Sequence, residues 1–319
     1  MAHSADTVNL TYVHKYEKKY RRQPASLIDI VHRFGSEDIC RDYLEKLRWE
    51  DGKPNCPRCD SESVSAISTR HQYDCNVCRC RFSVTSGTIF DNTKLPLWKW
   101  FAAVYLMLES KKSMSANQLS RTLTTTYKTA WFLCHRVREA MRDIESTKLS
   151  GIIEIDETWI GGRQRGGGKG HWHHTNKTAV VGAIERDGKV RLQVIHARTK
   201  RVLQGWIRKN VADETEAIYT DEWPPYAGIG DEDTRHETVN HRAKEWVRGL
   251  VHTNSVESIW SLLKRCIIGA FHKVSVKHLE RYLDELEFRF NNRHNQHAFR
   301  DIMKRLLSKE ALRYEKLTA

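Results

Sequence analysis

Two acidic residues stand in or at the end of short apolar runs in the second half of the chain, Asp156 after Gly151-Ile-Ile-Glu-Ile and Asp221 after Ala217-Ile-Tyr-Thr. An unpaired carboxylate on an apolar strand is costly unless a cation or a partner compensates it. The two-residue period of a strand puts Glu154 and Asp156 on one face and Glu157 on the other. Because carboxylates on neighbouring strands can share divalent ions, we predict that Asp156 and Asp221 form a divalent metal site.

A third element follows at residues 253–264, where the spacing predicts an amphipathic helix. Its apolar stripe is Val256, Ile259, Trp260, Leu263 and Ile267, and its opposite face carries Asn254, Glu257, Ser261 and Lys264. An acid and a lysine on this face would complete a metal site and contact a phosphate backbone. The structural alternative is that Asn254 and Glu257 form a capping box, that Asp156 is a satisfied strand acid and that Asp221 is a turn residue.

Four of the eight cysteines form a second motif. Two Cys-x2-Cys pairs, Cys56 with Cys59 and Cys75 with Cys78, are separated by fifteen residues. This is the spacing of a four-thiolate zinc site, and we predict one structural Zn²⁺. Buried, reduced cysteines are the alternative, and Cys80 is a spare thiol that could compete with Cys78.

A basic helical segment follows the cysteine region. Residues 115–123 and 127–141 predict two helices joined by Thr124-Thr-Thr126, an arrangement that resembles a helix-turn-helix. The candidate DNA contacts on the second helix and just after it are Lys128, Arg136, Arg138 and Arg142. A solvated helical hairpin would carry the same pattern, so the sequence leaves both interpretations open.

These motifs must be positioned by the elements around them. Strands are predicted at residues 152–156, 177–185, 190–196 and 217–221, with Asp187-Gly188 as a hairpin turn, a helix at 201–209 and two long helices near the C-terminus. This layout predicts an α/β fold of the ribonuclease H type, with a mixed sheet flanked by helices. The expected domains are a basic tail (1–35), a zinc ribbon with a leading helix (36–92), a helix-turn-helix region (93–148), the catalytic domain (149–300) and a C-terminal helix or tail (301–319).

Composition narrows the class of partner. The 319 residues hold 53 Lys and Arg against 40 Asp and Glu, a formal charge of +13 that favours a polyanionic partner. No apolar run approaches the ~20 residues that span a bilayer, and the N-terminus lacks a signal-peptide core. We therefore expect a cytoplasmic, nucleoid-associated protein without a membrane partner.

At this point several long motifs, in order, resemble one family. They are Cys-Pro-Arg-Cys59 with Phe82-Ser-Val-Thr-Ser-Gly-Thr-Ile-Phe90, Asp156-Glu-Thr-Trp-Ile-Gly-Gly162, Val181-Gly-Ala-Ile-Glu-Arg186, Thr220-Asp221, His252-Thr-Asn-Ser-Val-Glu-Ser-Ile-Trp-Ser-Leu-Leu-Lys-Arg265 and Tyr282-Leu-Asp-Glu-Leu-Glu-Phe-Arg-Phe-Asn-Asn-Arg293. The chain resembles the bacterial insertion-sequence transposases that carry an N-terminal zinc ribbon and an ISXO2-like, ribonuclease H-like DDE domain.

The resemblance implies an activity and the residues that carry it. Asp156 and Asp221 are the first two acids of the triad; family usage points to Asn254 at the third position, whereas the chemistry of hard cations favours Glu257, and Lys264 would hold phosphate. Two Mg²⁺ (or Mn²⁺) ions, about 3.5 to 4 Å apart, would serve cleavage at the element ends and strand transfer by in-line attack on a phosphodiester.

The implied partners are double-stranded DNA, as terminal inverted repeats and as target, and further copies of the chain in a homodimer or higher oligomer. The expected DNA contacts outside the helix-turn-helix are Lys264, Arg265 and, in the glycine-rich loop 161–174, Arg163, Arg165 and Lys169. In this loop His171, His173 and His174 are more consistent with a solvated basic segment than with a metal site. Gly170 follows Lys169 where a P-loop has Ser or Thr, so no nucleoside triphosphate is implied.

Two other functions compete with a transposase. A catalytically inactive or host-adopted zinc-ribbon DNA-binding regulator would bind DNA without cutting it. A structure-specific nuclease or resolvase of the same fold would cut DNA without joining the cut end to a target.

Overall fold

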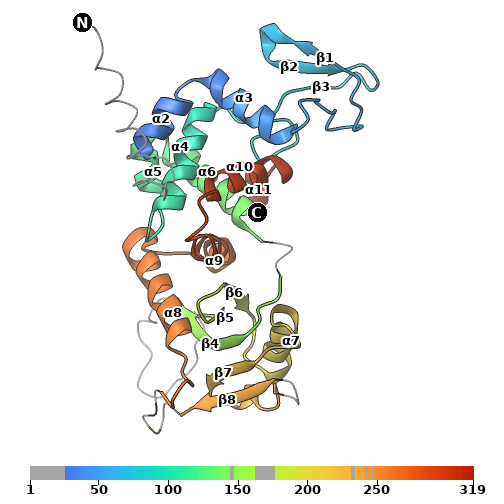
Figure 1. Ribbon diagram of the computed structural model, residues 1–319. Helices are drawn as coiled ribbons and strands as arrows, with labels where there is room; N and C mark the ends of the chain where they lie inside the picture. The colour runs from blue at the N-terminus through green and yellow to red at the C-terminus, as the bar shows by residue number, and fades with distance from the viewer. Residues whose placement is uncertain are drawn as a thin grey trace, which may run out of the picture. The chain divides into compact units, whose positions relative to one another are not determined.

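The computed structural model describes residues 26–143, 147–161, 177–230, 234–240, 243, 245 and 247–319. The described residues form two compact units (Figure 1). One contains those from Ser26 to Glu109, with Thr122–Thr125 and His294–Ala319, and the other contains those of Ser110–Arg121 and Thr126–Arg293. The predicted DNA-binding helices are thus grouped with the sheet. Within the described ranges, no helix is both long and apolar enough to cross a membrane.

The first unit packs α2 (Leu27–Phe34), α3 (Glu37–Arg48), α4 (Leu97–Glu109) and α10 (Ala298–Ser308) against one another, with α11 (Tyr314–Thr318) at the end of the chain. Its centre is aromatic: the Phe34 ring lies 4.7 Å from that of Phe101 and 5.0 Å from that of Tyr43. Helix α2 begins with a capping box between Ser26 and Asp29. The expected tail of residues 1–35 therefore ends in an ordered helix, because Ile30 and Phe34 give α2 a buried face.

The predicted ribbon is also present in this unit. Strands β1 (Val64–Ile67), β2 (Gln72–Cys75) and β3 (Arg81–Phe82) form an antiparallel sheet in the order β1-β2-β3. Arg48 of α3 donates to the carbonyls of Val84 (2.6 Å) and Ser86 (2.9 Å), which fixes the segment that follows β3. The helix predicted to lead into the ribbon is confirmed as α3.

The second unit is built on a five-stranded mixed sheet in the order β6-β5-β4-β7-β8. Its strands are β4 (Ile152–Ile160), β5 (Thr178–Glu185), β6 (Val190–Ile195), β7 (Ala217–Asp221) and β8 (Arg235–Val239). The first three are antiparallel, and β7 and β8 run parallel to β4. This order and direction confirm the expected ribonuclease H-like fold.

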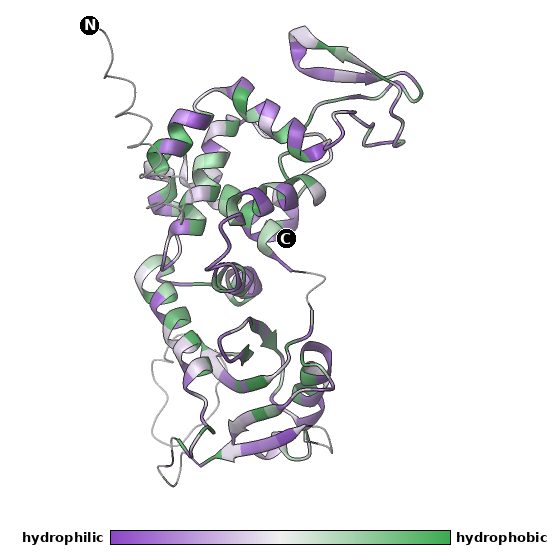
Figure 2. Ribbon diagram, in the orientation of Figure 1, coloured by the Kyte–Doolittle hydropathy of each residue, from purple (hydrophilic) through white to green (hydrophobic). Residues whose placement is uncertain are grey.

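Helices cover the two faces of this sheet. Helix α7 (Lys200–Asn210) packs Leu203, Trp206 and Ile207 against one face. Helices α8 (Asn254–Cys266) and α9 (Val276–Asn291) cover the other. Four residues of the predicted stripe, Val256, Ile259, Trp260 and Leu263, are buried there, and Ile267, just after α8, is half-buried. Figure 2 shows both hydrophobic and hydrophilic residues along these helices, as expected for elements with one buried face.

Two helices precede the sheet in the chain. Helix α5 (Ala116–Thr122) and helix α6 (Tyr127–Met141) confirm the predicted helix pair, and Thr126 caps α6 by accepting a hydrogen bond from the Thr129 amide. Nine of the fifteen residues of α6 are buried, and the helix packs on α9. Helix α6 is therefore mainly a core element of its unit.

Strand β8 was not predicted. Its sequence, Arg-His-Glu-Thr-Val239, is mostly polar, and it lies at the edge of the sheet beside β7. Edge strands commonly carry charged side chains, and only Val239 among these five is buried, so the hydrophobic pattern that marks inner strands is missing.

Candidate active site

Asp156 and Asp221 lie on adjacent parallel strands at corresponding positions. The pairing of β4 with β7 runs from Ile152 opposite Ala217 to Glu154 opposite Tyr219, and each acid follows two residues beyond that last pair. Since alternate residues of a strand share a face, both acids fall on the face that α8 covers, with Glu154 and Tyr219. Asp156 is the fifth of nine residues of β4 rather than its end, because the strand continues to Ile160 along β5.

Trp260 of α8 holds the Asp156 carboxylate in place. Its indole nitrogen donates a 2.9 Å hydrogen bond to Asp156 Oδ2. The residue opposite Asp156 on β5 is Gly182, and a Cβ built there would lie 2.5 Å from the Trp260 ring. Glycine at this position therefore lets the indole lie close enough to the sheet to reach the acid.

The environment of Asp156 opposes its ionisation. Burial raises the pKa of the Asp156 carboxyl to about 7, and the neighbouring charges of Glu157 and Asp221 act in the same direction. The hydrogen bonds from the Glu157 amide and the Trp260 indole act against them. A buried acid that feels a second carboxylate is the arrangement that a divalent cation stabilises.

Glu154 joins β4 to the start of α8. This side chain is fully buried, and its Oε2 accepts hydrogen bonds from the backbone amides of Ser255 (2.7 Å) and Val256 (3.2 Å). Its Oε1 accepts from Ser255 Oγ (2.9 Å) and Arg186 Nε (3.1 Å). A carboxylate at a helix N-terminus satisfies free amides and complements the helix dipole, so Glu154 fixes α8 two residues before Asp156.

This arrangement corrects the capping-box alternative. Thr253 is the N-cap of α8 and makes no side-chain cap hydrogen bond, whereas Asn254 is the first helical residue. Thr253 Oγ1 instead donates to Glu257 Oε1 at 3.2 Å. The amides at the start of α8 are capped by an acid about a hundred residues earlier in the chain, which local spacing could not reveal.

The two candidates for the third catalytic position lie on one exposed face of α8. Asn254, Glu257 and Lys264 are all exposed on the polar face of α8, as predicted. In the described part of the chain, only the cysteine cluster brings three or more Cys, His, Asp or Glu ligand atoms within 4.8 Å of one another. The carboxylates of Asp156, Asp221 and Glu257 are thus not drawn together to that extent.

Glu157 faces the opposite side of the sheet, as the strand period predicts. Its carboxylate accepts hydrogen bonds from Tyr226 Oη and Arg198 Nη2, both at 2.5 Å. Burial and the charge of Glu157 raise the pKa of Tyr226 well above its usual value, so the phenol remains a donor. Glu157 is therefore a structural partner of Arg198 and Tyr226.

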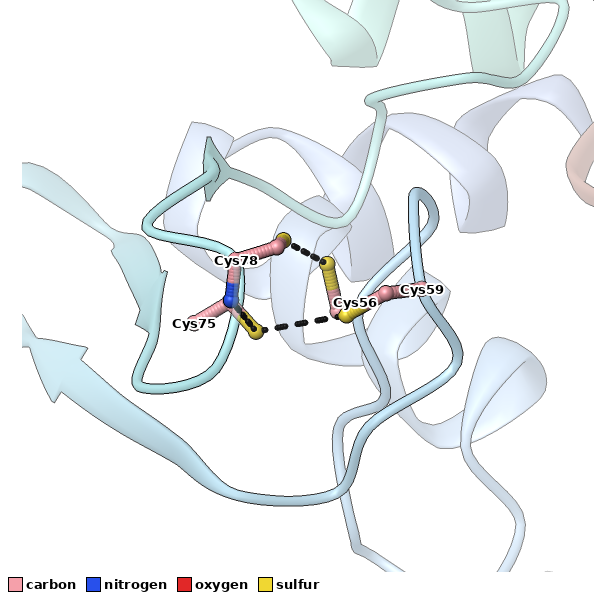
Figure 3. Close-up of side chains that lie close together, drawn as sticks. All are labelled: Cys56, Cys59, Cys75 and Cys78. Atoms are coloured by element: carbon pink, nitrogen blue, oxygen red, sulfur yellow. Dashed lines mark hydrogen bonds between the residues drawn. The ribbon is translucent and has the colours of Figure 1, made fainter.

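The four predicted zinc ligands meet in the ribbon (Figure 3). The Sγ atoms of Cys56 and Cys78 are 3.5 Å apart, and those of Cys59 and Cys75 are 3.6 Å apart. Tetrahedral Zn–S bonds of ~2.3 Å place sulfur atoms just under ~4 Å apart, so the cluster fits Zn²⁺. Cys80 lies outside the cluster, and its Sγ is 3.8 Å from the Arg81 carbonyl.

Two of the predicted DNA contacts on α6 are wrong. Arg138 is 1% exposed, makes a 2.7 Å ion pair with Glu285 of α9 and lies 4.0 Å above the Tyr282 ring. Arg136 is 4% exposed and lies over the ring of Phe132. Both residues look like DNA contacts in the sequence, but α6 turns their side chains inward, so neither projects from the exposed surface of the helix.

Lys128 and Arg142 are exposed near the two ends of α6, and Lys264 and Arg265 are exposed on the last turn of α8. The Arg265 guanidinium bonds Ser261 Oγ at 2.7 Å. The remaining candidates, Arg163, Arg165 and Lys169, and also His171, His173 and His174, lie outside the described residues.

Two parts of the chain match known protein families. Residues 148–291 match the ISXO2-like transposase domain, and residues 35–81 match the transposase zinc-ribbon domain. The chain is also 29% identical over 280 residues, 81% of its length and 92% of the relative's, to an uncharacterized protein in transposable element ISH50 of Halobacterium salinarum.

Solved structures share less with this chain. The Mos1 strand transfer complex is 10% identical over 65% of this chain and 75% of that chain, with a TM-score of 0.29. The intasome of simian T-cell lymphotropic virus, in complex with the PP2A regulatory subunit B56 gamma, is 14% identical over 54% of this chain and 63% of that chain, with a TM-score of 0.28. Such low scores add nothing to the fold assignment, which rests on strand order and direction.

Proposed function

The chain belongs to the insertion-sequence transposases that combine a transposase zinc ribbon with an ISXO2-like transposase domain, and from this premise we propose how it acts on DNA. It cuts the ends of its element and joins them to target DNA by in-line attack on phosphodiesters. The observation that carries the proposal is the position of Asp156 and Asp221, at corresponding places on adjacent parallel strands and on one face of the sheet.

Asp156 and Asp221 would hold the divalent ions, either Mg²⁺ or Mn²⁺, with Asn254 or Glu257 as the third ligand. Their carboxylates are the hard ligands that these cations prefer, and burial beside a second carboxylate makes Asp156 a group that gains from a cation. Bound ions, two in our proposal, supply Lewis acidity for activating the attacking oxygen and stabilising the leaving one. Trp260 orients Asp156 through its indole hydrogen bond, and Glu154 positions α8.

Exposed cations would place the DNA. Lys264 and Arg265 lie on the last turn of α8, which begins beside the carboxylates, and Lys128 lies on the first turn of α6. The N-terminal residues of a helix are those that contact base edges when it enters the major groove. The first turn of α6 and the zinc ribbon are therefore the proposed readers of the terminal inverted repeats, in a homodimer or larger assembly.

The test is an assay of strand nicking on a duplex that carries the element's end. Asp156→Asn should abolish Mg²⁺-dependent nicking, a loss of at least about a thousandfold, because a metal ligand is lost. It should leave binding of the end unchanged, as measured by gel shift, and Glu222→Gln, an exposed neighbour of Asp221, serves as the matched control.

The outcome also separates the competing functions. Full nicking by Asp156→Asn would remove this acid from the mechanism. A wild-type chain that binds without nicking would be a regulator, and one that nicks without joining the cut end to a target duplex would be a nuclease or resolvase.

A further inference from the structure

The second unit contains a cavity of about 460 Å³ away from the carboxylates. It is formed by the start of α5, the first turns of α6, the turn after α8 and the start of α9. Sites for small ligands and cofactors have volumes of about 300 to 1,000 Å³, so the cavity has room for one nucleotide.

Aromatic rings form much of its wall. Tyr127, Trp131, Phe271 and Tyr282 line the cavity, and the rings of Phe271 and Tyr282 lie edge to face with centroids 4.5 Å apart. Tyr127 is 57% exposed on the first turn of α6. A large aromatic ring at the mouth of a cavity is a surface on which a flat apolar ligand can stack.

The charge around these rings is positive. Arg121, Lys273 and the buried Arg138 line the cavity, and its lining includes no Asp or Glu. Glu285 neutralises Arg138 from behind. Arg121 and Lys273 are exposed, so they present cations to a ligand beside the aromatic faces. The combination matches a ligand with a flat ring and an anionic group.

Two histidines pack against the aromatic wall, and one of them, His278, also lines the cavity. His135 is fully buried, with its ring 4.8 Å from that of His278 and 4.4 Å from that of Trp131. Burial lowers the pKa of His135 to about 2, and burial also lowers the pKa of His278. Both rings are therefore neutral near pH 7 and act as packing partners of the aromatic wall.

The cavity lies beyond the C-terminal end of α8, whereas Asp156 is bonded to Trp260, midway along this helix. From Trp260 to the last residue of α8, Cys266, is about 9 Å at ~1.5 Å per residue, and Phe271 ends the turn that follows. Lys264 and Arg265 are exposed on the last turn of α8, between the two sites along the chain. A DNA backbone that follows this basic turn from the carboxylates would arrive at the cavity.

We propose that the cavity binds one extrahelical nucleotide of the DNA, with its base stacked on Tyr127 and Trp131 and its phosphate beside Arg121 and Lys273. The proposal rests on the proposed function, because it assumes that DNA lies on this unit. It adds a base-unstacking site that is separate from the metal site. Stacking on aromatic side chains tolerates every base, so the site would grip DNA without reading its sequence.

The experiment uses the full chain and a twelve-nucleotide oligothymidylate with one central 2-aminopurine, whose fluorescence is quenched by stacking on an aromatic ring. Wild type should bind this probe and quench it. Tyr127→Ala should weaken binding about tenfold or more and restore the fluorescence, whereas Tyr127→Phe, which keeps the ring, should behave as wild type.

Charge is tested by a matched pair. Lys273→Ala should weaken binding of the probe. It should also reduce the slope of log affinity against log salt concentration by the amount expected for one lost phosphate contact. Lys277→Ala, an exposed lysine nearby that does not line the cavity, should stay within about twofold of wild type.

The results separate this proposal from the catalytic one. If wild type nicks duplex DNA but does not bind or quench the probe, or if Tyr127→Ala binds it as wild type does, the cavity does not bind nucleotides and the transposase function stands. If the probe binds through Tyr127 but no nicking occurs with Mg²⁺, the nucleotide site stands and the catalytic proposal is overturned.

Discussion

Acidic side chains that are close together in the sequence have different contacts and different roles in the second unit. Three acids within four positions of β4 have three roles: Glu154 caps α8, Asp156 faces α8 beside Asp221, and Glu157 bonds Tyr226 on the opposite side of the sheet. The alternation of a strand explains why Glu157 is separated from the other two. Glu154 and Asp156 lie on the same face but have different roles, because Glu154 contacts the first amides of α8 and Asp156 contacts Trp260.

Glu154→Gln tests the positioning role of the capping acid. An amide in place of the carboxylate loses the charge opposite Arg186 and presents N–H groups to backbone donors, so we expect a loss of about 3 kcal/mol in the free energy of unfolding. At a low temperature, where the variant is still folded, its nicking rate should be lower than that of wild type. The Mg²⁺ concentration for half-maximal nicking should be higher than for wild type.

The control for this variant is Glu216→Gln, because Glu216 is exposed and pairs with Arg235 at the surface. It should leave both quantities unchanged. A Glu154→Gln chain that is less stable but has the wild-type Mg²⁺ requirement would make Glu154 a purely structural residue.

At the scale of elements, the sequence predicted most of what the structure contains. The hydrophobic period of strands and amphipathic helices can be read from the sequence, which is why β5, β6, β7, α6 and α8 were predicted near their observed bounds. The start of β4 was predicted correctly, but the strand runs four residues further than predicted, to Ile160. Strand β8 carries polar residues at a sheet edge and α2 lies in a segment that looked like a tail, so neither gave a clear pattern.

The candidate site was predictable only in part, because local patterns are visible in the sequence and long-range contacts are not. Asp156 and Asp221 could be identified because acids in apolar strands are costly and therefore conspicuous. The contacts of Glu154 with α8 and of Trp260 with Asp156 join residues about a hundred positions apart, and no local spacing encodes them. The inward turn of Arg138 likewise depended on α9, which supplies Glu285.

Arg138→Ala tests the corrected role of α6. Removing this guanidinium leaves Glu285 buried with only the longer contact to Arg289, at 3.6 Å, so the free energy of unfolding should fall by about 3 to 5 kcal/mol in urea titrations. Arg142→Ala, on the exposed end of the same helix, should change it by no more than about 0.5 kcal/mol.

DNA affinity tests the other corrected contact on α6. Under conditions where both variants are folded, Arg142→Ala should weaken DNA binding, and Arg136→Ala should not, because Arg136 is buried and does not line the cavity. A stable Arg136→Ala chain with weakened DNA binding would return Arg136 to the DNA-contacting surface.

At the scale of the whole molecule, two compact units divide the work that the sequence suggests. One holds the cysteine cluster in the β1-β2-β3 ribbon, and the other holds the acids on the mixed sheet with the helix pair α5 and α6. Each unit has a hydrophobic core of its own, so damage to the metal cluster in one is not expected to unfold the other.

Cysteine substitutions test this separation. Cys75→Ser should reduce zinc from one equivalent per chain to nearly none by atomic absorption, and should unfold the ribbon. Cys80→Ser should keep its zinc, since Cys80 lies outside the cluster. Loss of zinc in Cys80→Ser, or retention of a full equivalent in Cys75→Ser, would show that the ligand set is different.

The most direct test of the central claim is a measurement of Mn²⁺ binding to the zinc-loaded chain by electron paramagnetic resonance. If Asp156 and Asp221 share the ions that serve catalysis, Asp156→Asn and Asp221→Asn should each lose Mn²⁺ binding, and Glu222→Gln should keep it. Undiminished Mn²⁺ binding by either Asp variant would contradict the account.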